Sequence, residues 1–429
     1  MNDGTSSRKR KIIYVESNVD GTVGGSYFSL LFLIEALNKS IYEPVVVFYR
    51  DNHLIPCYRK AGARVYLFCR CKPIKLGCAL AGSERRSGLR LVSAVFRLCS
   101  QVFQKTFNYL FTFLYPSLKC WFILRRERAD LVHLNNTLCR PHEWMLAALF
   151  SGTRVVAHER GINQQFSKQA VFWARRLSAI VCISDAVKLN LIRAGFPKDK
   201  LVRIYNGLEA EKFSASKRRN VVLRELGIGD GSQIIGVVGN IKQWKGQEVV
   251  IRALKRIRDT FPNVKCLIVG HVASADQWYL EFLKALIRDG ALEDAVIFTG
   301  PRKDVADLVN CMRVLIHSSV EPEPFGRVLL EGMALKRPVI STRIGAPLEI
   351  VVDGRTGILV APGDPEELAE AVVTLLSDRA LAERMGAAGY ERLVSEFTVK
   401  RNVELTESLY AGLLGSKDQK TPVSGCGKV

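Results

Sequence analysis

The sequence has no apolar run long enough to cross a bilayer. The longest stretch in its first half, Thr106–Leu118, lies between two lysines and contains Pro116, whereas a spanning helix needs about 18 apolar residues. No apolar core of a secretory signal follows the basic residues that start at Arg8. We therefore expect a protein that works in the cytoplasm.

Residue spacings that mark metal sites are also absent. The eleven cysteines are scattered, and no second Cys/His pair accompanies the loose group of Cys69, Cys71 and Cys78. No Asp-x-Asp pair stands at the end of an expected strand. The sequence predicts reduced thiols, no metal and no resident cofactor.

Composition excludes a mainly disordered chain, because 48% of the residues are hydrophobic and 24% are charged. A length of 429 residues favours two domains. Lysine and arginine number 62 against 42 acids, which gives a net charge of +20. This excess predicts an anionic neighbour: a phosphorylated ligand, an acidic membrane surface or nucleic acid.

The positive charge is concentrated in one segment rich in aromatic rings. From Arg59 to Arg128 there are fifteen basic residues and two acids. Aromatic rings at the acyl boundary and cations on head groups are typical of interfacial helices. We therefore expect this segment to dock on an anionic membrane surface; for its part over 96–124, a buried structural insert and a membrane span or re-entrant loop are the alternatives. The rings are Phe96, Phe103, Phe107, Tyr109, Phe111, Phe113, Tyr115, Trp121 and Phe122.

Short β-branched runs alternate with stretches long enough for helices along the rest of the chain. Continuous apolar runs are typical of strands buried on both faces, as in parallel sheets with helical crossovers. Two successive series of runs predict an α/β protein with two facing, doubly wound, Rossmann-like domains. The runs are Lys11–Val15, Val45–Tyr49, Arg64–Phe68, Leu131–Asn135, Arg154–His158, Ile180–Ser184, Val202–Asn206, Ile234–Gly239, Lys265–Gly270, Ala295–Gly300, Val314–Ser318, Pro338–Thr342 and Gly357–Val360.

The polar stretch Lys212–Asn220 predicts the linker between the domains. Ligands of such sheets bind outside the carboxyl ends of the strands, so we expect the site in a deep cleft between the domains. The expected parts are an N-terminal Rossmann-like domain over 1–212 with the basic aromatic insert at about 70–128, a C-terminal Rossmann-like domain over 221–395, a helix over 396–415 that packs back on the first domain, and a disordered tail over 416–429.

Residues 321–333 read Glu-Pro-Glu-Pro-Phe-Gly-Arg-Val-Leu-Leu-Glu-Gly-Met and follow an expected strand. The prolines forbid a helix before Phe325, so a helix begins near Gly326. Its free N–H groups form an anion site suited to a diphosphate. Glu323 can accept hydrogen bonds from hydroxyls on one side of such a diphosphate, and Glu331 from hydroxyls on the other. The simpler alternative is that both are ordinary acids near a helix start, where carboxylates are favourable.

Three further groups stand at the ends of expected strands. Lys245, followed by Gly246, can neutralise charge on a departing phosphate, and a solvated loop lysine is the alternative. His158 can hydrogen-bond a hydroxyl in the cleft, and Gly25 leaves room for a ligand beside a helix start. We expect the other histidines to be structural: His53, His133, His142, His271 and His317.

In their order along the chain, these segments resemble the retaining glycosyltransferases of family 4, the group 1 enzymes with the GT-B fold. The resemblance spans nearly the whole chain, and the family's Glu-x7-Glu element corresponds to Glu323 and Glu331 within Glu-Pro-Phe-Gly. It also includes Ser184-Asp185, Asn206-Gly207-Leu208-Glu209, Lys245-Gly246, Gly300-Pro301-Arg302-Lys303-Asp304-Val305 and Gly354-Arg355-Thr356-Gly357-Ile358-Leu359-Val360.

The resemblance implies a role for each site residue. Lys245 would contact the diphosphate and Glu331 the ribose of a nucleotide-sugar donor. The donor sugar would be bound by Glu323 and His158. Backbone groups would complete the site, at Gly25, Phe325 and Gly326.

One departure from the family pattern concerns charge. Asn240 stands where the family often has arginine, so either Lys242 or Arg302 would compensate, or the diphosphate would depend more heavily on Lys245. The resemblance also implies transfer with retention of anomeric configuration from a UDP-, GDP- or ADP-sugar. The leaving phosphate oxygen would help to deprotonate the acceptor.

The basic aromatic insert lies in the half that usually holds the acceptor. We therefore expect a saccharide or lipid-linked saccharide acceptor, a role in cell-surface polysaccharide or glycolipid synthesis, and a peripheral position on the cytoplasmic membrane face. A nucleotide-sugar-binding protein without activity is an alternative. A nucleic-acid-binding protein would explain the charge but not the acids, so no nucleic acid is expected.

Overall fold

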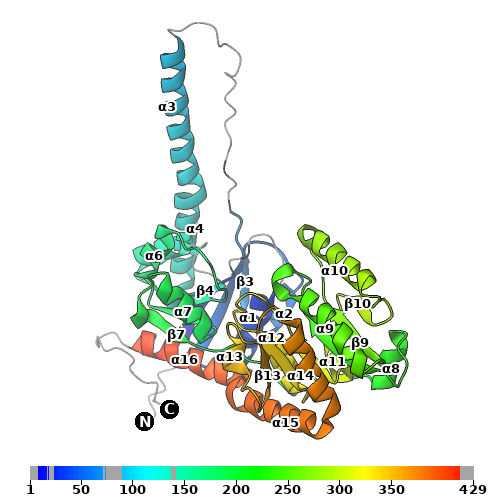
Figure 1. The fold of residues 1–429 in the computed structure, drawn as a ribbon. Coiled ribbons are helices and arrows are strands. Elements are labelled where there is room, and N and C mark those ends of the chain that lie inside the picture. Colours follow the sequence, from blue (N-terminus) through cyan, green and yellow to red (C-terminus); the bar gives the residue numbers. More distant parts are fainter. Residues whose placement is uncertain are drawn as a thin grey trace, which may run out of the picture.

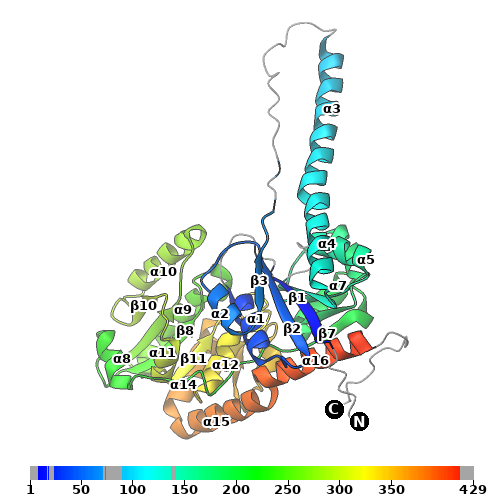
Figure 2. The ribbon, with the colours of Figure 1, turned by 180° about the vertical axis from the view of Figure 1, so that it is seen from behind.

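The computed structural model describes residues 8–16, 18, 24–70, 73, 89–136 and 142–415, without the side chains of 89–98. The tail 416–429, which we expected to be disordered, lies outside the described residues. The same holds for 71–72 and 74–88 of the basic aromatic insert. Figures 1 and 2 show two sheets with helices packed around them.

The first sheet is entirely parallel, in the order β3-β2-β1-β4-β5-β6-β7. Its central strand is buried throughout Ile12–Val15, which is why its apolar run is continuous rather than alternating. The strand order reverses between β1 and β4, and ligands of such sheets bind at that switch point. The strands are β1 (Arg10–Glu16), β2 (Tyr42–Phe48), β3 (Arg64–Leu67), β4 (Leu131–Asn136), β5 (Arg154–Glu159), β6 (Ala179–Cys182) and β7 (Leu201–Arg203).

The second sheet is also parallel, in the order β10-β9-β8-β11-β12-β13, with its switch point between β8 and β11. Each strand of the two sheets overlaps one of the predicted runs, and the predicted α/β class with two doubly wound parallel sheets is confirmed. The strands are β8 (Gln233–Val238), β9 (Val264–Val269), β10 (Val296–Gly300), β11 (Val314–His317), β12 (Val339–Thr342) and β13 (Gly357–Val360).

Helices connect successive strands and cover both sheets (Figure 1). In the first half they are α1 (Gly25–Ala36), α2 (Ile55–Lys60), α3 (Leu89–Tyr109), α4 (Tyr115–Glu127), α5 (His142–Ser151), α6 (Lys168–Ala174), α7 (Asp185–Arg193) and the short η2 (Lys198–Lys200). In the second half they are α8 (Arg219–Glu225), α9 (Gln247–Thr260), α10 (Gln277–Asp289), α11 (Val305–Cys311), α12 (Arg327–Ala334), α13 (Pro347–Ile350), α14 (Pro365–Ser377), α15 (Arg379–Glu396), α16 (Val399–Gly415) and the short η3 (Gln243–Lys245) and η4 (Ser274–Asp276).

A single helical run, α3 followed by the π-helical turn η1 (Leu110–Leu114) and α4, rises from the first sheet. Figures 1 and 2 show α3 projecting well beyond the body of the protein. The π turn ends two residues before Pro116, the second residue of α4, which cannot donate a helical hydrogen bond. Within the described part of the chain, no helix is both long and apolar enough to traverse a bilayer.

The two halves contact each other at the ends of their strands and through the last helices. The Ser184 hydroxyl donates to the Pro324 carbonyl at 2.7 Å, and the Glu349 carboxylate accepts the first amides of α7. After α15 the chain returns to the first sheet, where α16 packs against α1 and buries Tyr410. The carboxyl ends of both sheets thus face a common region.

Candidate active site

Glu323 lies between β11 and α12, and only 8% of its surface is exposed. Its Oε2 contacts Lys245 Nζ and lies 3.2 Å from His317 Nε2 and 3.3 Å from Ser319 Oγ. The amide of Ala346 donates to the Glu323 carbonyl at 2.9 Å. These contacts fix the carboxylate in one orientation at the switch point of the second sheet.

The same contacts determine the charge of Glu323. Burial alone raises the pKa of a carboxyl group, but the hydrogen bond from His317 and the charge of Lys245 outweigh it and lower the pKa of Glu323 to about 2. The side chain is therefore ionised at neutral pH. It can accept hydrogen bonds from ligand hydroxyls but cannot act as a general acid.

Lys245 reaches Glu323 because the backbone at Gly246 passes very close to β11. Gly246 has φ +65°, and a Cβ there would lie 2.1 Å from the carbonyl oxygen of Ser318. The Ser318 hydroxyl donates to the Lys245 carbonyl at 2.9 Å. This close approach aims the ammonium group of Lys245 at the carboxylate of Glu323.

The start of α12 lies beside the first sheet. Gly326, with φ +88°, precedes the helix, and Arg327 Nη1 is 3.4 Å from the Gly25 carbonyl oxygen at the start of α1. The ring of Phe325 packs against Tyr205, so only its backbone is available to a ligand. Burial raises the pKa of Glu331, an effect that the charge of Arg327 opposes.

A buried polar network occupies the carboxyl ends of β1, β4 and β5, opposite these groups. His158 Nδ1 lies 3.2 Å from His133 Nε2 and 3.2 Å from Arg160 Nη2. Asn135 links Arg160 to Glu16, because its Oδ1 accepts from the guanidinium and its Nδ2 donates to Glu16 Oε2 at 2.6 Å. Burial raises the pKa of Glu16 to about 7.

The partners of His158 determine where its proton lies. Burial, with a smaller effect of Arg160, lowers the pKa of His133 to about 3 and that of His158 well below its usual range, so both rings are neutral. Arg160 can only donate, so His158 Nδ1 is an acceptor and its proton is on Nε2. Among the described residues this buried Nε2 has no hydrogen-bond partner, which leaves an N–H free for a ligand hydroxyl.

The sequence did not single out several of these groups. His133 and His317 were expected to be structural, and the structure shows that they contact His158 and Glu323. Neither Glu16 nor Asn135 was predicted as a site residue. Their position at the end of a buried strand was the available signal, because carboxyl ends of parallel strands converge on one edge of a sheet.

Other predicted residues are engaged elsewhere. Arg302 forms a two-point ion pair with Asp304, at 2.8 and 2.6 Å, and Lys242 Nζ lies 3.7 Å from Asp276. The Asn240 carbonyl accepts from Gln247 at 3.1 Å, while its side chain is exposed. Of the cations considered for the diphosphate, only Lys245 contacts Glu323. The described residues contain no cluster of His, Cys, Asp or Glu that could hold a metal ion.

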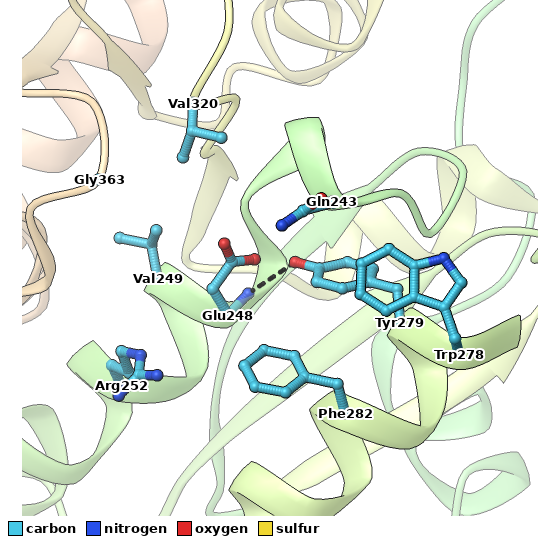
Figure 3. Close-up of a pocket in the computed structure, with 9 residues that line it drawn as sticks. All are labelled: Gln243, Glu248, Val249, Arg252, Trp278, Tyr279, Phe282, Val320 and Gly363. Carbon is cyan, nitrogen blue, oxygen red and sulfur yellow. Dashed lines mark hydrogen bonds between the residues drawn. The ribbon is translucent and has the colours of Figure 1, made fainter. Parts of the chain in front are cut away.

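A cavity of about 450 Å³ adjoins the Lys245 loop at Gln243 (Figure 3). Trp278 and Phe282 of α10 line it with exposed rings. The Glu248 carboxylate points into it, burial raises the pKa of that group, and its Oε2 has no partner among the described residues. Apolar walls with a few polar groups are typical of small-molecule sites. None of these residues was predicted from the sequence to belong to a site.

Solved structures with this architecture are glycosyltransferases of the GT-B fold. Anabaena HepE in complex with UDP has a TM-score of 0.75 and 23% identity over 94% of this chain and 100% of that one. A glycosyltransferase from Rickettsia africae has a TM-score of 0.76 and 20% identity over 96% of this chain and 100% of that one. These likenesses establish the GT-B fold.

Sequence comparisons give the family. Residues 219–392 match the family "Glycosyl transferases group 1" and residues 30–212 match "Glycosyltransferase Family 4". A D-inositol 3-phosphate glycosyltransferase of Corynebacterium diphtheriae is 31% identical over 66% of this chain and 70% of its own. An N-acetyl-alpha-D-glucosaminyl L-malate synthase of Bacillus anthracis is 26% identical over 68% of this chain and 77% of its own.

The chain belongs to the group 1 glycosyltransferases and is an enzyme of that class. The resemblance drawn from the Glu-Pro-Phe-Gly and Lys-Gly segments is confirmed.

Proposed function

We propose that the protein transfers a sugar from a UDP-, GDP- or ADP-sugar to a saccharide or lipid-linked saccharide, with retention of configuration and without a metal. The observation that carries this proposal is the contact of Lys245 with the buried Glu323 just before α12, next to the point where Arg327 of that helix reaches the Gly25 carbonyl at the start of α1. The structure of HepE with UDP-glucose supports a nucleotide-sugar donor.

The chemistry follows from where charge develops. The bond between the anomeric carbon and the phosphate oxygen breaks, leaving positive charge on the sugar and negative charge on the nucleoside diphosphate. Lys245 and the backbone amides at the start of α12 stabilise the departing phosphate. The acceptor oxygen then bonds to the anomeric carbon on the face that the phosphate leaves, and its proton passes to the leaving phosphate oxygen.

The other site residues bind and orient the donor. The ionised Glu323 accepts hydrogen bonds from sugar hydroxyls, and the Nε2–H of His158 donates one from the opposite sheet. Glu331 holds the ribose, and the backbone of Gly25, Phe325 and Gly326 approaches the phosphate and sugar. Glu323 serves as a ligand of the donor rather than as a nucleophile.

The acceptor side faces a membrane in this proposal. The basic aromatic insert at 70–128 places the enzyme peripherally on the anionic cytoplasmic membrane face, where a lipid-linked acceptor for a cell-surface polysaccharide or glycolipid would be found. Relatives named for lipopolysaccharide core and capsular polysaccharide synthesis support this assignment.

The proposal is tested by donor binding and by turnover. Thermal shift with UDP-, GDP- and ADP-sugars should identify one stabilising class. Lys245→Ala and Glu323→Gln should lower turnover by about 100-fold or more, while Lys255→Ala, an exposed change on α9, should not alter it.

Donor binding without turnover in the wild-type protein would favour a nucleotide-sugar-binding protein instead. Turnover that is unchanged in both site variants would reject the site.

A further inference from the structure

The helical run α3–η1–α4 leaves a continuous row of large apolar side chains in solvent. Neighbouring rings stack along it, with centroids 6.0 Å apart for Phe103 and Phe107 and 4.4 Å apart for Phe107 and Phe111. Phe103 and Phe122 are each 61% exposed. The row continues onto the end of α5, where Phe150 is 75% exposed. Soluble monomers rarely expose an apolar surface of this extent without a partner.

The exposed charges of the described residues of α4 around this surface are positive. Lys119 Nζ lies 4.4 Å from the centre of the Tyr115 ring and the Arg125 guanidinium 5.7 Å from that of Trp121. The two acids of α4 and α5 point inward and are paired: Glu127 with Lys11 and Arg64, and Glu143 with Tyr49 and Arg70. A partner of this surface must therefore offer apolar groups together with negative charge.

An apolar groove of about 380 Å³ opens between α4 and α5 on this surface. Its lining comes from two turns of each helix: Leu114, Leu118 and Trp121 face Leu146, Ala147 and Phe150. Two of its lining side chains carry a polar atom, Ser117 and Trp121. The Ser117 hydroxyl donates to the Phe113 carbonyl within the same helical run, so the indole N–H of Trp121 is the one side-chain donor of the lining that is not paired within the helix, and the walls are otherwise apolar.

We propose that this groove binds a hydrocarbon chain of an anionic membrane lipid, with Lys119 and Arg125 at its rim holding the head-group phosphate. This inference rests on the membrane association proposed above and assigns the membrane contact to the groove between α4 and α5. The charge complementarity favours a lipid over a second copy of this chain, which would bring the same cations against each other. Burial of Leu118 and Phe150 among lipid chains would remove the largest apolar exposure of the groove from water.

The test uses the full-length protein and vesicles of phosphatidylcholine with and without phosphatidylglycerol. Phosphatidylcholine with a nitroxide on its acyl chain should quench tryptophan fluorescence when phosphatidylglycerol is present, because Trp121 lines the groove. Trp121→Phe should lose most of this quenching, whereas Trp278→Phe, an exposed tryptophan of the second half, should keep it.

Vesicle co-sedimentation tests the two chemical parts separately. Lys119→Glu with Arg125→Glu should weaken binding to phosphatidylglycerol vesicles by about tenfold or more, and high salt should do the same. Leu118→Ser with Phe150→Ser should weaken it by a similar factor and abolish the quenching. The matched control, Lys255→Glu with Arg379→Glu, makes the same charge change on α9 and α15 and should have a much smaller effect.

Equal quenching in Trp121→Phe, or equal binding to vesicles with and without phosphatidylglycerol, would overturn the inference. A stable dimer in solution that loses vesicle binding would also overturn it and would assign the surface to a second copy. Thermal shift with nucleotide sugars in the same samples separates the two proposals: a normal shift without quenching contradicts only the lipid site, and quenching without a shift contradicts only the donor site.

Discussion

Glu323 and Glu16 are both buried acids at strand ends, yet their surroundings shift their pKa in opposite directions. Glu323 has a cation and a histidine against one oxygen, and its pKa falls to about 2. Glu16 receives amide hydrogen bonds, but burial dominates and raises its pKa to about 7. One acid is thus ionised throughout the physiological range, whereas the other titrates within it.

The two shifts predict separate pH windows for stability. The ionised Glu323 contributes its full stabilisation to the folded protein above the ordinary carboxyl pKa. This contribution to the free energy of unfolding is lost as the pH falls toward 2. Glu16 acts in the other window, because its folded pKa is raised: ionising it in the folded state becomes costly as the pH rises from about 4.5 to 7. Only the Glu16 effect operates near neutral pH.

The substitution Glu16→Gln should therefore remove the pH dependence that Glu16 gives to the free energy of unfolding near neutral pH. The free energy of unfolding of the wild-type protein should fall by about 2–3 kcal/mol between about pH 5 and about pH 8, relative to Glu16→Gln. Chemical denaturation of both proteins at the two pH values measures this difference. Parallel pH profiles would show that Glu16 titrates normally.

At the scale of residues, the site residues that could be predicted from the sequence are those within short motifs that follow one another in a known order along the chain. Glu323, Lys245 and Gly246 were identifiable because their neighbours form short motifs. His317 and His133 were not, because their roles depend on partners from other strands. Which partner a strand-end side chain meets is set by strand order and packing, and a single sequence does not contain that information.

At the scale of the elements, the conformation of the turn from η3 into α9 depends on a single residue, Gly246. Gly246 combines a left-handed φ with an approach to Ser318 that leaves no room for a methyl group. Gly227 has a similar φ of +69°, but nothing lies within 4 Å of its added Cβ. Alanine substitution at Gly227 therefore tests the cost of the left-handed backbone alone, whereas the same substitution at Gly246 adds a steric clash with Ser318.

Gly246→Ala should destabilise the protein by about 2 kcal/mol or more, whereas Gly227→Ala should cost about 1 kcal/mol. Gly246→Ala should also lower turnover, since the loop must move away from β11 and take Lys245 with it. Thermal unfolding and turnover of both variants provide the check. Equal losses of stability would mean that the close approach at 246 is unimportant.

Strands and crossover helices were the most predictable elements. Continuous runs such as Val45–Tyr49 identified each strand to within a few residues, and the stretches between them are the crossover helices, as with α9 between β8 and β9. The continuous helix through Pro116 was less predictable, because it depends on a π turn that single-residue preferences do not indicate. The direction in which it projects depends on packing against α5.

At the scale of the whole molecule, the last helix is connected to the site in the first sheet. Tyr410 of α16 lies 2.5 Å from His133 Nδ1. Because His133 Nε2 faces the acceptor Nδ1 of His158, the neutral His133 carries its proton on Nε2 and accepts from the Tyr410 hydroxyl at Nδ1. The chain end thereby helps to hold the proton of His158 on the nitrogen that faces the donor in our proposal.

The substitution Tyr410→Phe should remove the hydrogen bond that favours the Nε2-protonated tautomer of His133, while the aromatic ring stays in the core. Leaving His133 Nδ1 unpaired should cost about 1–3 kcal/mol of stability, and the nitrogen chemical shifts of His133 and His158 should change. Turnover should fall more than it does in Tyr14→Phe, which removes the other hydroxyl near Tyr410. Unchanged histidine shifts would contradict the proposed chain of hydrogen bonds.

The central claim is that an activated sugar binds with its diphosphate against Lys245 and the start of α12. Crystals soaked in turn with UDP-, GDP- and ADP-sugars test it most directly. We expect one of these compounds to lie between the sheets, with its sugar hydroxyls on Glu323 and Nε2 of His158 and its phosphates on Lys245. A nucleotide sugar bound away from Glu323 and Lys245 would contradict the claim.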